Sequence, residues 1–269
     1  MSHFNVAVIT KGKPTEAKIA ELLAPYDENL EVPHTVTKSQ IIAEGKEQID
    51  NRKPIYDEYL KSPEKFAQEH SSYQVEYYSK DFPRELGYTD EEIYNKQIKY
   101  YEGDKILSNG DVISTYNPNS KWDWYDVGGR FSGMLETLNG KCNYARIKDV
   151  INLTDKKEGA KARRFWELYV DGEPPVTEDD KEILGRFHFY RKEYYIEHYK
   201  TKENYERYCS TFLTYAAITK DGTWHQQGEM GWWGMSSGDD EMGWCDRYRE
   251  LIFDDAEDDD YITIIDCHI

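Results

Sequence analysis

The sequence is poor in cysteine and has no long apolar stretch. Its few cysteines form no Cys-x-x-Cys pair, so neither a zinc knuckle nor a thiol redox motif is indicated; they are Cys142, Cys209, Cys245 and Cys267. No window approaches the roughly 18 apolar residues of a membrane span. The N-terminus MSHFNVAVIT also lacks the basic segment and apolar run of a secretory signal. We therefore expect reduced thiols, a cytoplasmic location and no contact with a membrane.

Lysine and arginine are scarce relative to acidic residues. The chain has 34 Lys and Arg against 52 Asp and Glu, which gives a formal net charge of −18. Contact with nucleic-acid phosphates needs concentrated basic residues, so direct nucleic-acid binding is not expected. A basic partner is compatible with this charge, although the charge could equally serve only to keep the chain soluble. The hydrophobic fraction of 38% and the aromatic fraction of 14% are enough for a folded core.

The order of β-rich and helical segments predicts the fold class. Residues 4–10 and 261–267, near the two ends, are almost uninterrupted β runs that are typical of central strands. Hairpins are predicted around Asn139-Gly140 and around Lys220-Asp221-Gly222. We therefore expect an α+β fold with an antiparallel or mixed sheet backed by helices, for which a ferredoxin-like core is one candidate.

Composition also predicts the domain organisation. Residues 37–105 are rich in Glu, Lys, Gln and Tyr and carry helix-capping signals, so they read as a helical insertion. Pro54 predicts a break that divides this insertion into several short helices. Residues 151–209 form a second helical segment. The remaining ranges are assigned to the α+β core: 1–36, 106–150 and 210–269.

The most distinctive segment is KWDWYDVGGRF at residues 121–131, which places aromatic residues and an arginine around two glycines. Trp122, Trp124 and Tyr125 could stack on a ligand ring. Arg130 could make a bidentate contact with a carboxylate or phosphate, and Gly128-Gly129 permits positive φ. Alternatively, the tryptophans fill the core and a nearby aspartate pairs with Arg130 inside the fold.

A second aromatic and glycine-rich segment spans residues 228–244, GEMGWWGMSSGDDEMGW. If the fold joins the two segments, they would line one pocket or interaction patch with Arg130 as its polar anchor. Residues 239–260 add eleven Asp or Glu and two Arg, half of the net charge. This stretch could face a basic groove or imitate a nucleic-acid backbone, or it is a solvated loop. The candidate binding residues here are Trp232, Trp233, Trp244, Asp239, Asp240 and Glu241.

Catalytic and metal-binding motifs are weak. Residues 234–238 match G-x-S-x-G, but no series of βαβ units precedes them, so an esterase is not expected. The histidines show no metal-ligand spacing. His3 and His268 could meet if the terminal strands are neighbours and could then bind a metal with Cys267, although paired strand ends are a simpler explanation. We predict no catalytic residue, no metal and no cofactor.

Four motifs resemble a family of phage and prophage proteins that is itself uncharacterised. They are HFNVAVIT at the start, LAPYDEN at residues 23–29, the central KWDWYDVGGRF and the closing IIDCHI. The resemblance touches both ends and the middle of the chain and does not extend to the helical insertions. It implies a virus-encoded accessory protein of the host-cell cytoplasm, and it brings no family active site.

Two functional hypotheses follow. The leading one is a non-enzymatic phage-type protein that binds and blocks a host defence complex, such as a nuclease system of the Gabija type. It would use acidic and aromatic surfaces, and assembly into a homo-oligomer is a further expectation. The alternative is a sponge-like protein for small nucleotides, in which a base is sandwiched by tryptophans and its phosphate meets Arg130. The four tryptophans of that pocket would be Trp122, Trp124, Trp232 and Trp233.

Overall fold

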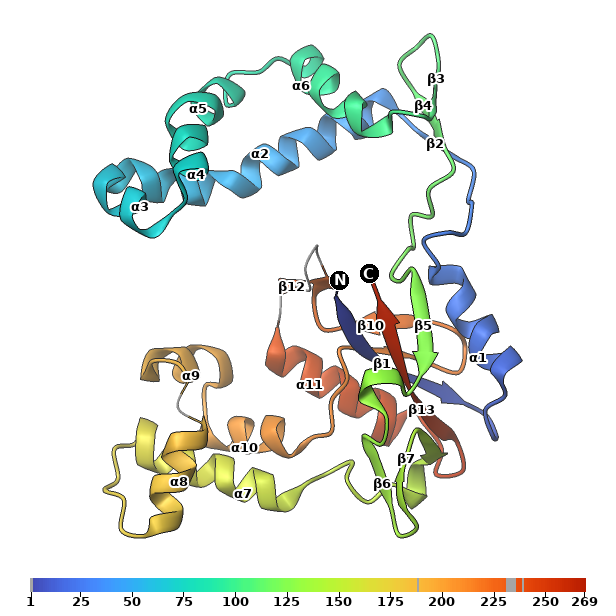
Figure 1. The fold of residues 1–269 in the computed structure, drawn as a ribbon, viewed down its shortest axis with the longest axis vertical. Coiled ribbons are helices and arrows are strands. Elements are labelled where there is room, and N and C mark those ends of the chain that lie inside the picture. The colour runs from blue at the N-terminus through green and yellow to red at the C-terminus, as the bar shows by residue number, and fades with distance from the viewer. Residues whose placement is uncertain (1, 188, 231–235, 239) are drawn as a thin grey trace. The chain divides into compact units, whose positions relative to one another are not determined.

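The structure is a computed structural model that describes residues 2–187, 189–230, 236–238 and 240–269 (Figure 1). The chain divides into two compact units. Met1–Glu28 and Asn119–Ile269 form the first, here called the sheet unit, and Asn29–Pro118 form the second, here called the helical unit. No helix in the described part of the chain is long and apolar enough to cross a bilayer.

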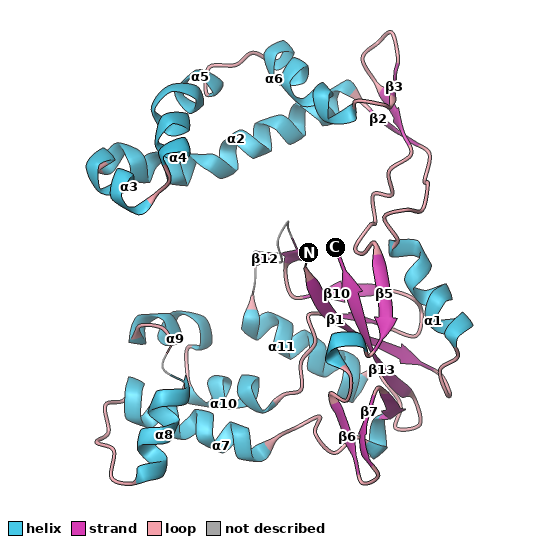
Figure 2. Cartoon of the chain, viewed as in Figure 1, coloured by secondary structure: helices cyan, strands magenta, loops and turns pink. Residues whose placement is uncertain are grey.

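The sheet unit is built on its two terminal strands (Figure 2). Strand β1 (His3–Thr10) pairs antiparallel with β13 (Tyr261–His268) along its whole length, from His3 opposite His268 to Thr10 opposite Tyr261. Strand β9 (Ala216–Ile218) lies parallel to β1, and β10 (Trp224–Gln226) follows it at the edge. Strands β5 (Trp124–Val127) and β8 (Tyr144–Arg146) pair with the other side of β13. The predicted α+β class with a mixed sheet and central terminal strands is confirmed.

The strand order differs from a ferredoxin-like core. That core contains a split βαβ unit, in which another strand lies between the two parallel strands. Here β9 pairs directly with β1, and the Asn5 side chain helps to hold it there by accepting a 2.8 Å hydrogen bond from Tyr215 N. Both predicted hairpins are present: β9 with β10, and β6 (Leu135–Thr137) with β7 (Gly140–Cys142).

Both faces of the central strands are covered, because successive side chains of a strand point to opposite faces. Val6 and Val8 belong to a buried cluster with α1 (Glu16–Leu23), a helix that Thr15 caps. Ala7 and Ile9 belong to a second cluster that includes Trp244 and Tyr248 of α11 (Glu241–Arg249). The core strands therefore carry apolar residues at consecutive positions.

Four α-helices extend the sheet unit in the described residues between 156 and 210. They are α7 (Lys156–Phe165), α8 (Glu178–Phe187), α9 (Lys192–Tyr199) and α10 (Lys202–Ser210). Their shared core is largely aromatic and includes Phe165, Trp166, Tyr195 and Tyr205. Many tyrosines therefore serve as core residues in this part of the chain.

The helical unit contains one long helix and a small sheet. Helix α2 (Lys38–Lys61) continues through Pro54, so the predicted break is wrong. Pro54 has no backbone N–H, so the helix loses one hydrogen bond there. Ile49, Tyr56 and Tyr59 on either side of it pack onto a buried aromatic cluster, and this packing offsets the loss. The shorter helices are α3 (Pro63–Glu69), α4 (Ser72–Glu76), α5 (Phe82–Glu85) and α6 (Asp90–Gln97).

The limits of the helical unit are wider than the predicted 37–105. Strand β2 (His34–Val36) pairs with β4 (Val112–Ser114), and β4 pairs with β3 (Lys105–Ile106), so these strands form a sheet of their own. The chain leaves and re-enters the sheet unit at adjacent places. Glu28 N donates to Trp122 O at 2.9 Å, and Lys121 N donates to Tyr26 O at 2.8 Å.

Candidate functional site

The first aromatic segment divides between the core and the surface. Trp122 is buried, its Nε1 donates to Leu23 O at 3.1 Å, and its ring packs edge-on against Tyr125. Tyr125 is partly buried, and this desolvation raises the pKa of its hydroxyl. Trp124 is 51% exposed, because it lies on the opposite face of β5 from Tyr125. Of these three rings, only Trp124 is available to stack on a ligand.

Arg130 follows the two glycines and is exposed. Its backbone N donates a 2.9 Å hydrogen bond to Asp266 Oδ2. Its guanidinium forms no ion pair with a residue that the structure describes, and Asp123 is instead bonded to His268. Arg130 can therefore offer its side chain to an anion.

The described candidate residues of the second aromatic segment have structural contacts. Trp232, Trp233 and Asp239 lie outside the described residues. Trp244 is buried and donates from Nε1 to Thr214 O at 2.8 Å. Its core cluster lies on the other face of the sheet from that of Trp122, so these two tryptophans do not share a pocket.

The two described acidic candidates of this segment have partners within the fold. Asp240 caps α11 by accepting from Gly243 N at 2.9 Å. Glu241 accepts a 3.1 Å hydrogen bond from the Tyr194 hydroxyl. Both residues therefore stabilise helices of the sheet unit rather than forming a free acidic face.

The two terminal strands bring His3 and His268 together. Their backbones are direct partners in the β1–β13 ladder, and their ring centroids lie 5.1 Å apart at an interplanar angle of 66°. This confirms that the two histidines meet, as expected if the terminal strands are neighbours. The Trp124 ring lies beside them, 6.2 Å from that of His3.

Each of these histidines is bonded to its own aspartate. His3 Nδ1 lies 2.8 Å from Asp266 Oδ1, and His268 Nδ1 lies 2.5 Å from Asp123 Oδ1. Asp266 and His268 are two positions apart on β13 and share a face of the sheet. We call these four residues the histidine site.

The glycine turn fixes the position of Asp266. Gly129 has φ +44°, and a Cβ built on it would lie 2.4 Å from Asp266 Oδ2. Only glycine lets the backbone come this close, and the approach allows Arg130 N to donate to the carboxylate. The turn thereby holds the aspartate that orients His3.

Both aspartates bind Nδ1 and leave Nε2 of each ring without a carboxylate partner. When a neutral imidazole donates its Nδ1 proton to a carboxylate, Nε2 keeps a lone pair that can accept a proton. His268 Nε2 is buried and has no hydrogen-bond partner among the described residues. Such an atom is unusual in a folded protein and calls for an explanation. The site therefore holds two oriented imidazoles, and neighbouring side chains have to move before water or a substrate can reach Nε2 of His268.

Cys267 does not join the histidines. It lies between Asp266 and His268, so its side chain points to the other face of the sheet, where it is fully buried beside Phe4. Burial raises the pKa of its thiol, which keeps it protonated. No group of three or more His, Cys, Asp or Glu in the described ranges is placed to hold a metal ion.

No protein-family profile, no curated protein and no solved structure matches this chain. The histidine site therefore rests on its geometry alone. The resemblance to phage and prophage proteins stays a prediction. Three of the four motifs that carry it, HFNVAVIT, KWDWYDVGGRF and IIDCHI, supply all four residues of the histidine site.

Proposed function

We propose that the chain is an enzyme that hydrolyses a phosphodiester by acid–base catalysis at the histidine site, whereas its sequence predicts no catalytic residue. The observation that carries this proposal is the pair of adjacent imidazoles, each oriented through Nδ1 by a separate aspartate. An oriented histidine is the commonest general acid or base in enzymes. Two such rings can serve the two proton transfers of one hydrolysis once neighbouring side chains move to expose the buried Nε2 of His268.

The reaction needs one neutral and one protonated ring. The neutral imidazole accepts a proton from water through Nε2 while the water oxygen forms a bond to phosphorus. The protonated imidazole donates its proton to the leaving oxygen as the other P–O bond breaks. The products are a phosphomonoester and an alcohol, and exchange with solvent restores the two protonation states.

Arg130 and Trp124 support an anionic substrate with a flat or apolar group. The Arg130 guanidinium is exposed on the turn that holds Asp266, and a guanidinium matches the geometry of a phosphate. Trp124 lies beside His3, and about half of its surface is exposed to solvent. The net charge of −18 repels long polyanions and so favours a small substrate over nucleic acid.

Hydrolysis of bis(p-nitrophenyl) phosphate by the full chain tests this proposal. We expect turnover, and a loss of at least 100-fold in the variants His3→Gln and His268→Gln. His198→Gln is the matched control, because His198 lies on the exposed side of α9 away from the site, and it should keep wild-type turnover. No turnover by the folded wild-type protein, or equal turnover in all three variants, would contradict the proposal.

A further inference from the structure

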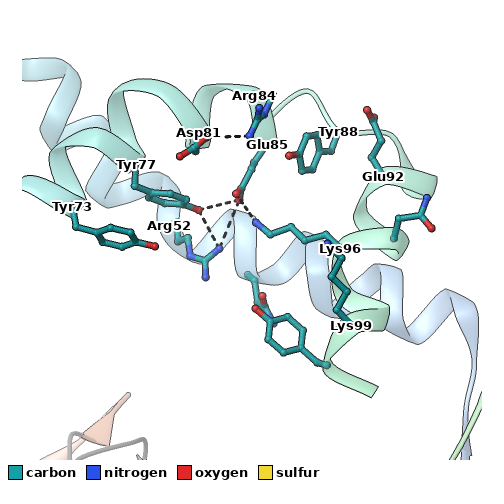
Figure 3. A pocket seen from close by; sticks show the side chains of 13 residues that line it. Arg52, Tyr73, Tyr77, Asp81, Arg84, Glu85, Tyr88, Glu92, Lys96 and Lys99 are labelled. Atoms are coloured by element: carbon teal, nitrogen blue, oxygen red, sulfur yellow. Dashed lines mark hydrogen bonds and ion pairs between the residues drawn. The ribbon is translucent and has the colours of Figure 1, made fainter. Parts of the chain in front are cut away.

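The helical unit contains a cleft of its own, of about 770 Å³ (Figure 3). Helix α2 forms one wall, and residues from α4 to just beyond α6 form the other. All residues that line it belong to the helical unit. Pockets for small molecules commonly have volumes of about 300–1,000 Å³, so this cleft is large enough for one.

A buried carboxylate lies at the centre of the cleft. Glu85 is only 5% exposed, accepts a 2.9 Å hydrogen bond from the Tyr77 hydroxyl and is also bonded to Lys96 Nζ. Arg52 Nη1 is 3.8 Å from the same carboxylate and donates to the Tyr77 hydroxyl at 3.2 Å. Figure 3 shows these side chains converging on Glu85. One carboxylate thus faces two cations, which leaves an excess of positive charge.

The charge of the cleft is opposite in sign to that of its surroundings. Four basic side chains line it against three acidic ones, whereas the helical unit as a whole has 11 Lys and Arg against 17 Asp and Glu. Asp81 is paired with Arg84, and the Glu92 carboxylate accepts hydrogen bonds from Thr89. Lys99 forms no ion pair with any residue in the described ranges. The acidic side chains are thus engaged, as are Arg52, Arg84 and Lys96, and the charge of Lys99 remains for an anion.

Tyrosines give the cleft flat aromatic surfaces. Tyr73, Tyr77, Tyr88 and Tyr100 all line it. Tyr73 and Tyr100 are 76% and 75% exposed, which is a large exposure for aromatic side chains. Burial, together with the hydrogen bond to Glu85, raises the pKa of Tyr77, so its hydroxyl stays protonated and donates to Glu85. Exposed tyrosines beside basic groups suit a ligand that has both a ring and a negative charge.

We propose that this cleft binds a mononucleotide, with the phosphate near Arg52 and Lys99 and the base against the rim tyrosines. Arg52 supplies planar N–H donors, and Lys99 supplies an unpaired charge within the same lining. The base stacks on Tyr100, which is 75% exposed and follows Lys99 in the lining of the cleft. This binding site is separate from the histidine site and does not depend on the reaction proposed there.

Isothermal titration of the full chain with AMP, adenosine and inorganic phosphate tests the inference. We expect AMP to bind more tightly than either fragment. Lys99→Gln should weaken AMP binding about tenfold, as for the loss of one charge-assisted hydrogen bond. Tyr100→Ala should weaken AMP and adenosine binding and leave phosphate binding unchanged. Both side chains are at the surface, so these variants should fold.

The controls separate this site from the other one. Lys105→Gln removes a charge from β3, outside the cleft, and should bind AMP as the wild type does. His3→Gln should also keep wild-type affinity. The inference is overturned if AMP does not bind, if phosphate alone binds as tightly as AMP, or if Lys99→Gln and Tyr100→Ala bind normally. AMP binding that is lost only in His3→Gln would place the ligand at the histidine site and would also overturn it.

Discussion

Replacing Gly129 with alanine tests whether the glycine turn sets the geometry of the histidine site. Gly129 has φ +44°, where an L side chain costs about 1–2 kcal/mol. The new Cβ would lie 2.4 Å from Asp266 Oδ2, which is shorter than a van der Waals contact. Asp266 is buried, so its carboxylate can move away only by giving up the hydrogen bond from Arg130 N.

The magnitude follows from these two effects. A hydrogen bond to a charged group contributes about 1.5–3 kcal/mol, so Gly129→Ala should lower the free energy of unfolding of the sheet unit by about 2.5–5 kcal/mol. Gly12→Ala is the matched control. Gly12 also has positive φ, at +84°, but no atom lies within 4 Å of its added Cβ. The control should therefore show only the backbone strain of about 1–2 kcal/mol.

Urea unfolding followed by tryptophan fluorescence measures this difference. All seven tryptophans lie outside Asn29–Pro118, so the signal reports on the sheet unit alone. Gly129→Ala should also reduce hydrolysis of bis(p-nitrophenyl) phosphate more than Gly12→Ala does. If the two variants are equally stable, the turn does not hold Asp266, and the link from the glycines to His3 is refuted.

Two further predictions concern the helices of the sheet unit. Arg164 beside Asp180, with backbone N–H donors, holds the pKa of that carboxyl well below its ordinary value. Asp180→Asn should therefore destabilise the protein fully above about pH 5 and progressively less below about pH 4, as thermal melts across pH can show; a constant loss would contradict this. Burial raises the pKa of the Cys209 thiol to about 12. Iodoacetamide at pH 8 should label it much faster in urea than in the folded protein, and equal rates would count against this burial.

The terminal strands were the most predictable part of the fold. The β runs at both ends are apolar at nearly every position, which indicated central strands, and their full antiparallel pairing places His3 opposite His268. In the first aromatic segment, the alternation of side chains along a strand explains which ring is exposed. Trp124 and Tyr125 are consecutive on β5, so one faces out and the other in.

Other features depend on contacts that local sequence does not encode. Asp123 and Asp266 became partners of the histidines only through the sheet register, across 145 and 263 positions of the chain. The parallel pairing of β9 with β1 likewise joins residues far apart in the chain, such as Val6 and Ala216. The local effect of Pro54 predicts a break in the helix, whereas packing of neighbouring side chains keeps α2 continuous.

The hypothesis that the chain blocks a host defence complex, as a phage accessory protein and in oligomeric form, remains a prediction. Affinity capture of the full chain from infected or defence-expressing cells, followed by mass spectrometry, is the direct measurement. Recovery of a defence nuclease whose activity falls on binding is the expected result. Failure to recover any host protein would count against the hypothesis.

The adjacent exit and re-entry points of the helical unit have a consequence for how the chain can change. Because Glu28 and Trp122 are hydrogen-bonded, the sheet unit needs only a short connection at this place. The entropy of closing a loop rises slowly with its length, so a 90-residue insertion here adds little to the cost of folding the sheet. We therefore expect that insertions, replacements or deletions of the helical unit leave the register of the strands that carry the histidines unchanged.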